Sequence, residues 1–329
     1  YTRYTGDYSY LADYGLRVLI AISRFWAQRV NISAEKKKYV ILGVTGPNMY
    51  ENNVNNNWFT NFIATWSLQF TIDSIEKVKK IDFRKYEDLI QEIQFNADEI
   101  FLWKDIIENM YYPENKELGI FVQQDGFLDK ALTKVSDIPE SQLPINQHWT
   151  WDKILRSSFI RQADVVQGLY VFDDLFDVET IKRNFDFYEP FTVHESSISA
   201  STHSIVASTI GNKQKAYELY LRTARLDLDD YNNEVAEGLH ITSMAGTWLA
   251  IVQGFGGMRV KNDKLYFNPH IPEKWNAFAF NILFRGNQLN IRVEKDKTII
   301  HNIKGGTLEL YLNNQLVEVL AESQREIKN

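Results

Sequence analysis

The sequence predicts a mainly helical chain that ends in a small antiparallel β domain. Gly and Pro number only 16 and 7 among 329 residues, so helix breakers are few and long helices are expected. Apolar residues recur at helical spacing as far as Gly256-Gly257 and tend to alternate beyond it. This change of period divides the chain into a helical part, residues 1–257, and a β part, residues 258–329.

The helical part begins with an apolar stripe between Tyr8 and Val30 that includes Leu11, Leu16 and Ile22. A last helix is expected to start near Thr242, with Thr242 or Ser243 as its N-cap. Similar stripes predict helices over Phe59–Lys79, Ala97–Met110, Ile160–Leu175, Val178–Tyr188, Ser197–Thr209 and Lys213–Leu226.

The β part shows period-two segments separated by turn signals such as Arg285-Gly286-Asn287 and Gly305-Gly306. The predicted strands are Lys264–Phe267, Ala277–Phe284, Gln288–Val293, Thr298–Ile303 and Thr307–Leu312.

Loops rich in aromatic and amide residues separate the helices, and loops carry function more often than the elements that hold them. They are Thr45–Asn61, Gln123–Asp129, Asn146–Asp152 and the surroundings of His194. A helical array with such loops at one end fits an α/α barrel with a cleft. An α-solenoid would also fit, but the sequence has no regular period to support it.

Composition excludes several partners. The net charge is −7 and no Lys/Arg-rich stretch is long enough to follow a phosphate backbone, which argues against nucleic acid. There is no cysteine, so disulfides and thiolate metal sites are excluded, and a reducing, cytoplasmic location is expected. No apolar run approaches the roughly 20 residues that span a bilayer. Tyr1-Thr2-Arg3-Tyr4 resembles neither a signal peptide nor a start, so the chain is expected to begin inside a domain.

Three further segments could carry chemistry. Gly238–Trp248 opens a helix with small residues, which suits either an anion site or simple capping. His194-Glu195-Ser196-Ser197 with His203 lacks the His-Glu-x-x-His zinc spacing, so no metal is expected, and Glu195 is either a cleft carboxylate or an acceptor for a helix N-terminus. Arg161-Gln162, expected on a helix, is either a ligand contact or surface charge.

The segment from Gly43 to Asn61 joins a Gly-Pro loop to a run of asparagines, which suits sugar hydroxyls or a solvated helix cap. It resembles the acid loop of family 65 glycoside phosphorylases, the maltose phosphorylase type in particular, where Gly-Pro-Asn/Asp-Glu-Tyr leads into an Asn-rich helix entry. Met49 stands at the Glu position. The resemblance extends in order over most of the chain, through Tyr4–Tyr8, Gln123–Phe127, Arg161–Val165, Phe187–Pro190, His194–Ser197, Leu226–Asn233 and Gly238–Trp248.

The resemblance implies part of an (α/α)6 barrel followed by a small C-terminal β domain, with an N-terminal β-sandwich and the first barrel helices lying outside this chain. It implies that the loop around Gly238–Trp248 binds phosphate, which makes His240, Ser243, Gly246 and Thr247 the phosphate candidates. It implies that Arg161 and Gln162 contact glucose, although the family normally has Lys-Gln and an arginine lacks the compact ammonium.

The implied reaction is maltose plus phosphate giving β-glucose 1-phosphate plus glucose, with inversion. Phosphate is already a nucleophile, so such an enzyme needs only the acid of the usual carboxyl pair, and no cofactor. A thioether has no proton to transfer, so Met49 is expected to impair turnover strongly. Glu51 matches a separate position of the motif and is not expected to replace the acid.

Two alternatives stay open at this point. The first is a disaccharide phosphorylase, for maltose or else for kojibiose, nigerose or trehalose. The second is a non-catalytic sugar-binding relative. The expected partners are a disaccharide, phosphate and a second copy in a homodimer, with no membrane.

Overall fold

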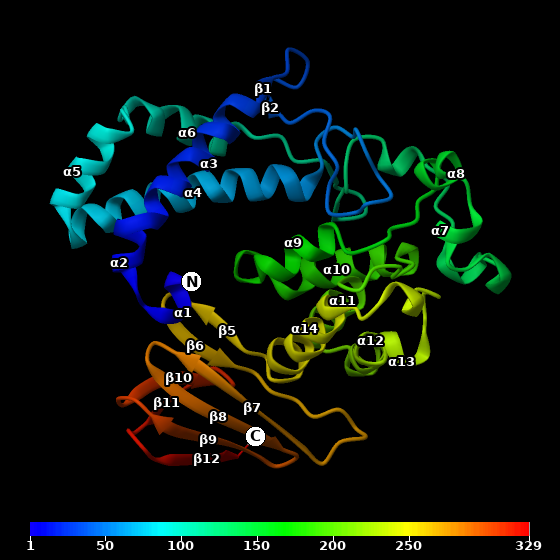
Figure 1. Ribbon diagram of the computed structural model, residues 1–329. Helices are drawn as coiled ribbons and strands as arrows, with labels where there is room; N and C mark the ends of the chain where they lie inside the picture. Colours follow the sequence, from blue (N-terminus) through cyan, green and yellow to red (C-terminus); the bar gives the residue numbers. More distant parts are fainter. Residues whose placement is uncertain (329) are drawn as a thin grey trace.

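The structure is a computed structural model that describes residues 1–328, and it is mainly helical with a β domain at its C-terminal end (Figure 1). The chain starts with α1 (Thr2–Thr5), α2 (Tyr8–Tyr10), a π-helical turn (Leu11–Gly15) and α3 (Leu16–Arg29). The next elements are β1 (Asn31–Ile32), β2 (Tyr39–Val40), α4 (Trp58–Ile81), α5 (Phe83–Glu92), α6 (Asp98–Asn109), β3 (Glu114–Asn115) and β4 (Ile120–Phe121).

The second half of the helical part holds α7 (Ile145–His148), α8 (Trp151–Arg156), α9 (Val165–Val171), α10 (Val178–Tyr188), α11 (Ser199–Thr209), α12 (Lys213–Ala224), α13 (Leu226–Asp229) and α14 (Ile241–Leu249). Short 3-10 turns lie at Phe127–Asp129, Val135–Asp137, Glu140–Gln142, Asp173–Leu175, Glu189–Phe191 and Val235–Glu237, and a π-helical segment, Ala250–Phe255, follows α14.

Helix α4 is the longest of these elements and extends from the left edge to the middle of the molecule in Figure 1. Asn57 caps it, because its Oδ1 accepts the N–H of Thr60 at 2.9 Å. Helix α4 contributes Leu68 and Ile75 to one core with α3 and α6, while Trp58 at its first turn packs into a second core with α9 and α10. A helix that buries apolar residues on two sides is set firmly between the two layers, so its N-terminal loop has a fixed position.

Each predicted helical stripe contains a helix, whereas α5, α7 and α8 were not predicted, and two predicted stripes need correction. The stripe predicted over Ile160–Leu175 forms a helix only at Val165–Val171, since Ile160 instead bridges to Thr192 as extended backbone. Arg161 and Gln162 therefore lie on a loop and not on a helix. The last helix starts one residue earlier than predicted, and its N-cap is His240, which makes no side-chain cap.

The β domain consists of two four-stranded sheets. One has the order β11-β10-β6-β5 and the other β12-β9-β8-β7, and apolar residues of both, including Phe267, Leu289 and Leu310, form one core. The predicted small antiparallel β domain is confirmed, and one strand pair of the described residues departs from it, because β10 runs parallel to β6. The strands are β5 (Arg259–Lys261), β6 (Lys264–Phe267), β7 (Ala277–Phe284), β8 (Asn287–Glu294), β9 (Lys297–Lys304), β10 (Leu308–Leu312), β11 (Gln315–Val319) and β12 (Gln324–Lys328).

The N-terminal residues pack on the β domain, as Figure 1 also shows for α1 beside β5 and β6. The Arg285 N–H donates to the Tyr4 carbonyl at 2.9 Å, and the Tyr8 hydroxyl donates to Asp263 at 2.7 Å. Over residues 1–328, no helix is both long and apolar enough to cross a membrane.

Candidate active site

The loop that carries Met49 runs from β2 to α4, and the buried Asp164 accepts hydrogen bonds from it. The carboxylate of Asp164 accepts the Asn48 N–H at 3.1 Å and the Asn57 amide at 3.0 Å. Gly46 lies against the same groups, since a Cβ there would stand 2.6 Å from an Asp164 oxygen. Asn48 and Asp164 are buried, whereas the Met49 side chain is 51% exposed. The loop is therefore rigid, and it presents position 49 to solvent.

Asp164 titrates abnormally because of this burial. Desolvation raises the pKa of its carboxyl to about 7, although the hydrogen bonds from Asn48 and Asn57 oppose the rise. Asp164 is 2% exposed, so its carboxyl supports the loop from the protein interior and does not reach the solvent that Met49 faces.

Arg161 lies directly beside Met49. Its Nη1 is 3.9 Å from the Met49 sulfur, and its Nε donates to the Glu195 carbonyl at 2.8 Å. Its backbone N–H donates to Asn48 Oδ1 at 2.9 Å, so the loop that carries position 49 also fixes the arginine backbone. The salt bridges found within residues 1–328 do not include Arg161. A cation without a carboxylate partner thus occupies the place next to position 49.

Glu195 is buried and fully engaged by hydrogen-bond donors. Its carboxylate accepts the Ile145 N–H at 2.5 Å, the Asn146 N–H at 3.2 Å and the Tyr50 hydroxyl. Burial raises the pKa of Tyr50, and its hydrogen bond to Glu195 raises it further, so the phenol keeps its proton. These contacts are those of the helix-terminus acceptor that the sequence offered as one of two interpretations of Glu195.

The Gln123 loop joins the Met49 loop through the backbone, because the Trp58 N–H donates to the Gln123 carbonyl at 2.9 Å.

Glu51 faces away from this surface. It is 5% exposed and forms an ion pair with Lys130, whose ammonium also donates to the Leu155 carbonyl at 2.9 Å. Burial raises the pKa of Glu51, while Lys130 lowers it. A buried carboxylate paired with Lys130 is not placed to protonate a ligand at position 49, as the sequence led us to expect.

His240 stands at the N-terminus of α14 and is oriented by Asp227. The Asp227 carboxylate accepts the His240 N–H at 3.0 Å and contacts Nδ1 at 2.5 Å. These hydrogen bonds lower the pKa of Asp227, so it stays ionised beside the imidazole. Within the described chain, the N–H groups of Ile241 and Thr242 have no acceptor. The other imidazole nitrogen, Nε2, lies 3.8 Å from a Glu234 carboxylate oxygen. The free helix N–H groups beside the imidazole are suited to an anion.

The other phosphate candidates are arranged differently. The Ser243 hydroxyl is buried and donates to the Thr223 carbonyl at 2.5 Å, and the Thr247 hydroxyl donates to the Ser243 carbonyl at 2.9 Å. Gly246 packs on α11, where a Cβ would stand 2.6 Å from the Ser201 Oγ. These three residues hold α14 in place, and the Ser243 and Thr247 hydroxyls are bonded to backbone carbonyls and not directed at the open end of the helix.

One loop joins the two halves of the site. Arg161 is bound to the Glu195 carbonyl, and two residues later the Ser197 hydroxyl contacts the Thr242 hydroxyl at the start of α14. Met49, Arg161, Glu195 and the α14 terminus are therefore connected by successive direct contacts. Gln162 is buried beside them, and its Oε1 has no partner within residues 1–328.

Sequence reasoning missed four residues on which this arrangement depends: Tyr50, Lys130, Asp164 and Asp227. Tyr50, Asp164 and Asp227 lie in the segments Gly43–Asn61, Arg161–Val165 and Leu226–Asn233 that carry the family resemblance, whereas Lys130 lies in none of them. The segment Asn146–Asp152 was predicted as a loop, but it contains the C-terminal part of α7 and the start of α8.

A second cluster lies behind the Glu195 loop and joins Glu189, His194 and His203. Their ligand atoms lie within 4.8 Å of one another, a geometry that could hold a metal ion. Glu189 already contacts His203 Nδ1, lies 3.4 Å from His194 Nε2 and is 3.4 Å from the Lys215 ammonium. Burial would raise the pKa of Glu189, but the two imidazoles outweigh it and hold the pKa well below its usual range. Burial lowers the pKa of His194 to about 4.

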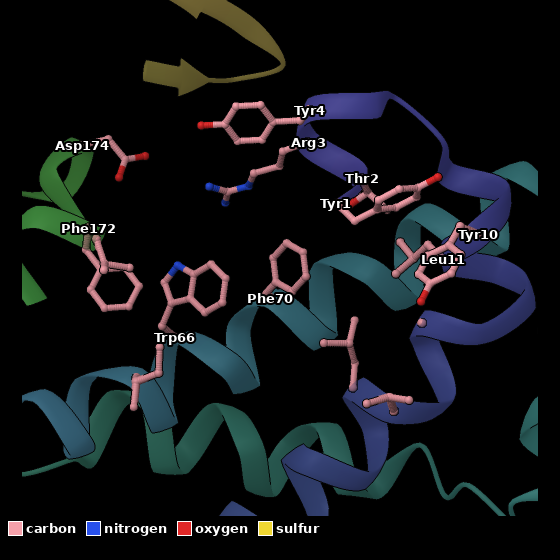
Figure 2. A pocket seen from close by; sticks show the side chains of 15 residues that line it. Tyr1, Thr2, Arg3, Tyr4, Tyr10, Leu11, Trp66, Phe70, Phe172 and Asp174 are labelled. Atoms are coloured by element: carbon pink, nitrogen blue, oxygen red, sulfur yellow. The ribbon is translucent and has the colours of Figure 1, made fainter. Parts of the chain in front are cut away.

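The groove in Figure 2 lies elsewhere, between the N-terminal helices and α4. It has a volume of about 530 Å³ and is lined by aromatic residues such as Tyr10, Trp66 and Phe172, with Arg3 and Asp174 at its edge. None of the predicted site residues lines it.

The helical layers, the β domain and the amide-rich loops at one end of the helices define the class of α/α-barrel proteins. Within that class the chain belongs to glycosyl hydrolase family 65. Residues 1–249 match the description "Glycosyl hydrolase family 65 central catalytic domain", and residues 258–319 match "Glycosyl hydrolase family 65, C-terminal domain".

The relatives described next carry the names of disaccharide phosphorylases. The chain is 50% identical over its whole length to the maltose phosphorylase of Bacillus subtilis (strain 168), of which it covers 42%. It is 39% identical over 94% of its length to the α,α-trehalose phosphorylase of Thermoanaerobacter brockii, of which it covers 40%. It thus spans about two-fifths of the length of these curated relatives.

A solved structure supports the same fold. It is described as a candidate kojibiose phosphorylase from human microbiome, is 35% identical and superposes with a TM-score of 0.91 over 100% of this chain and 48% of its own. The predicted fold class is confirmed: part of an (α/α)6 barrel followed by a small β domain.

Proposed function

We propose that the protein containing this chain is an inverting phosphorylase for an α-glucosyl disaccharide, of the maltose type. The observation that supports it most is the contact series from Met49 through Arg161 and the Glu195 loop to the α14 terminus. It joins a position suited to the leaving oxygen with a position suited to an anion. The relative with 50% identity is named a maltose phosphorylase, which favours maltose over kojibiose, nigerose or trehalose.

In the proposed reaction, phosphate is held by His240 and the N–H groups of Ile241 and Thr242, and it attacks C1 of the glucosyl group. The C1–O bond breaks as the new C1–O–P bond forms on the opposite face, which inverts the configuration. Arg161 and Gln162 are proposed to contact sugar hydroxyls. The buried Gln162 Oε1, which has no partner within residues 1–328, would accept one. Glu195 is proposed to act by holding α7 and Tyr50 in place, not by touching substrate.

The proton for the leaving oxygen is what this chain lacks. A thioether cannot supply it, and general acid assistance contributes roughly 10²–10⁴-fold. We therefore propose that disaccharide phosphorolysis is strongly impaired with Met49 in place. This one residue also favours a second candidate function, a non-catalytic sugar-binding relative.

The test uses the protein as its gene encodes it, incubated with phosphate and maltose, trehalose, kojibiose or nigerose. We expect slow formation of β-glucose 1-phosphate from one of them, and a gain of about 10² or more in rate for Met49→Glu. Leu283→Glu is the matched control, since Leu283 is 70% exposed on the β domain and distant from these loops. Maltose binding by calorimetry without product from either protein would instead establish the binding relative.

Several finer points remain predictions, some from the sequence pattern and some from the resemblance. They are the homodimer, the cytoplasmic location, the absence of a cofactor or structural metal, and the division of the chain into domains 1–257 and 258–329.

A further inference from the structure

Glu234 near position 49 accepts a hydrogen bond from Asn146 at 3.5 Å and lies 3.8 Å from His240 Nε2. Three further carboxyl groups around position 49 are each already committed elsewhere. Glu51 is paired with Lys130, Glu195 is held by Tyr50 and the N-terminus of α7, and Asp164 is buried beneath the loop. All three are at most 5% exposed, while Met49 is 51% exposed. None of them can therefore move to the solvent side of the loop and take over the missing proton transfer without breaking buried contacts.

Arg161 is the charged group that does reach this place. The acid at position 49 would have to touch the leaving atom, so a group within 4 Å of the side-chain end at position 49 borders the leaving group as well. Arg161 Nη1 is 3.9 Å from the Met49 sulfur. The bond from Nε to the Glu195 carbonyl holds the guanidinium plane, which leaves the two terminal nitrogens directed away from that anchor.

A fixed guanidinium cannot donate a proton at neutral pH, but it stabilises a negative charge that develops beside it. A sugar alkoxide is too basic to leave as an anion, so a disaccharide still needs an acid. A leaving group that is stable as an anion needs no such acid. Met49 and Arg161 together therefore favour donors with an anionic leaving group over disaccharides.

Resting on the proposed function, we propose that this chain transfers glucose to phosphate from α-glucosyl donors whose leaving group departs as an anion, with Arg161 stabilising that anion. Such donors are α-glucosyl fluoride and α-glucosyl phosphates. A phosphate oxygen forms the new bond to C1 as the bond to the leaving group breaks. The leaving group takes the bonding electron pair, and no proton is transferred to it. The product is β-glucose 1-phosphate.

The experiment compares the native protein with Met49→Glu on two kinds of donor. With α-glucosyl fluoride and phosphate, we expect phosphate-dependent fluoride release at rates within about tenfold of each other. With maltose, the native protein should be slower by about 10² or more, the contribution of a general acid. A second arm supplies α-glucose 1-phosphate with isotopically labelled phosphate and follows labelled β-glucose 1-phosphate by phosphorus NMR. Labelled product in the second arm supports the proposal for glucosyl phosphates as well as for the fluoride. Product with α-glucosyl fluoride alone supports the proposal for fluoride as the leaving group.

Arg161→Gln tests the role of the guanidinium, with Arg161→Lys as the conservative variant. We expect Arg161→Gln to reduce fluoride turnover at least tenfold and Arg161→Lys to retain more of it. With a series of substituted phenyl α-glucosides, kcat/KM of Arg161→Gln should fall more steeply as the leaving phenol becomes more basic. A merely structural role of Arg161 would lower all donors equally and would overturn its assignment. Thermal unfolding of each variant checks that the fold is kept.

The two proposals fail separately. No phosphate-dependent turnover of either anionic donor by the native protein, while Met49→Glu phosphorolyses a disaccharide, overturns this inference and leaves the proposed function intact. An inactive Met49→Glu on every disaccharide, with no turnover of the anionic donors, overturns both.

Discussion

The buried carboxylate of Glu195 accepts the phenolic hydrogen of Tyr50, so the loop that carries position 49 is tied to the loop that leads into α11. The same carboxylate receives two N–H groups of α7. Three separate segments therefore meet at one buried anion. Removing any donor leaves this anion less well solvated, which is more costly in the interior than at the surface.

The first prediction concerns this contact. Tyr50→Phe should lower the free energy of unfolding by about 1.5–3 kcal/mol, the range for a hydrogen bond to a charged group. Denaturant titration measures it. Tyr14→Phe is the matched control, because Tyr14 is 65% exposed and should change little. An equal loss in both variants would contradict the anchoring role of Glu195.

The second prediction concerns the pH dependence of the restored acid. A carboxyl introduced by Met49→Glu would lie beside the Arg161 guanidinium, and an opposite charge at that distance lowers its pKa. The protonated acid would then be present only at low pH, so kcat for maltose should fall as pH rises through that depressed pKa. The double variant Met49→Glu with Arg161→Lys should shift the fall to higher pH, because the lysine reaches less far. Coincident pH–rate profiles for the two variants would contradict the proximity of the charges.

The third prediction concerns phosphate. His240→Ala should raise KM for phosphate about tenfold or more, which corresponds to ~1.4 kcal/mol, while KM for the sugar changes less. Asp227→Asn should act in the same direction, since Asp227 orients the imidazole. His301→Ala in β9 is the control. A rise in sugar KM alone would place His240 elsewhere in the site.

The fourth prediction separates packing from phosphate binding at Gly246. Gly246→Ala places a Cβ 2.6 Å from the Ser201 Oγ and 2.8 Å from its Cβ, so the variant should be destabilised by about 1–3 kcal/mol. Adding Ser201→Gly removes both atoms and should recover much of the loss in a thermal unfolding experiment. Recovery of stability together with normal phosphate KM would establish that Gly246 serves helix packing.

The fifth prediction follows from the pKa of Asp164, which burial raises to about 7 from an ordinary value near 3.8. The folded state then binds more protons than the unfolded state between these values, so the contribution of Asp164 to stability is lost as pH rises through this window. The destabilisation caused by Asp164→Asn should therefore shrink between pH 5 and pH 7.5. Asp152→Asn should show no such trend, because Arg156 lowers the pKa of Asp152, which leaves that group ionised throughout. A constant or growing deficit for Asp164→Asn would contradict the raised pKa.

The sequence by itself determined the fold class and the family. These depend on periodicity and on motifs in order along the chain, which need no tertiary contact to be recognised. The helix Val178–Tyr188 and the strands Lys264–Phe267 and Ala277–Phe284 have the predicted bounds, because periodicity alone defines them.

The tertiary structure decided the surroundings of each candidate side chain. The sequence left Glu195 between a cleft carboxylate and a helix acceptor, because only contacts with Tyr50 and α7, 145 and 50 residues away, distinguish them. It predicted a helix at Arg161, since an apolar stripe cannot reveal that Ile160 pairs with Thr192. The proximity of Arg161 to Met49, 112 residues apart, is likewise a property of the folded chain. Local pattern fixes what an element is, but long-range hydrogen bonds and burial fix what its side chains face.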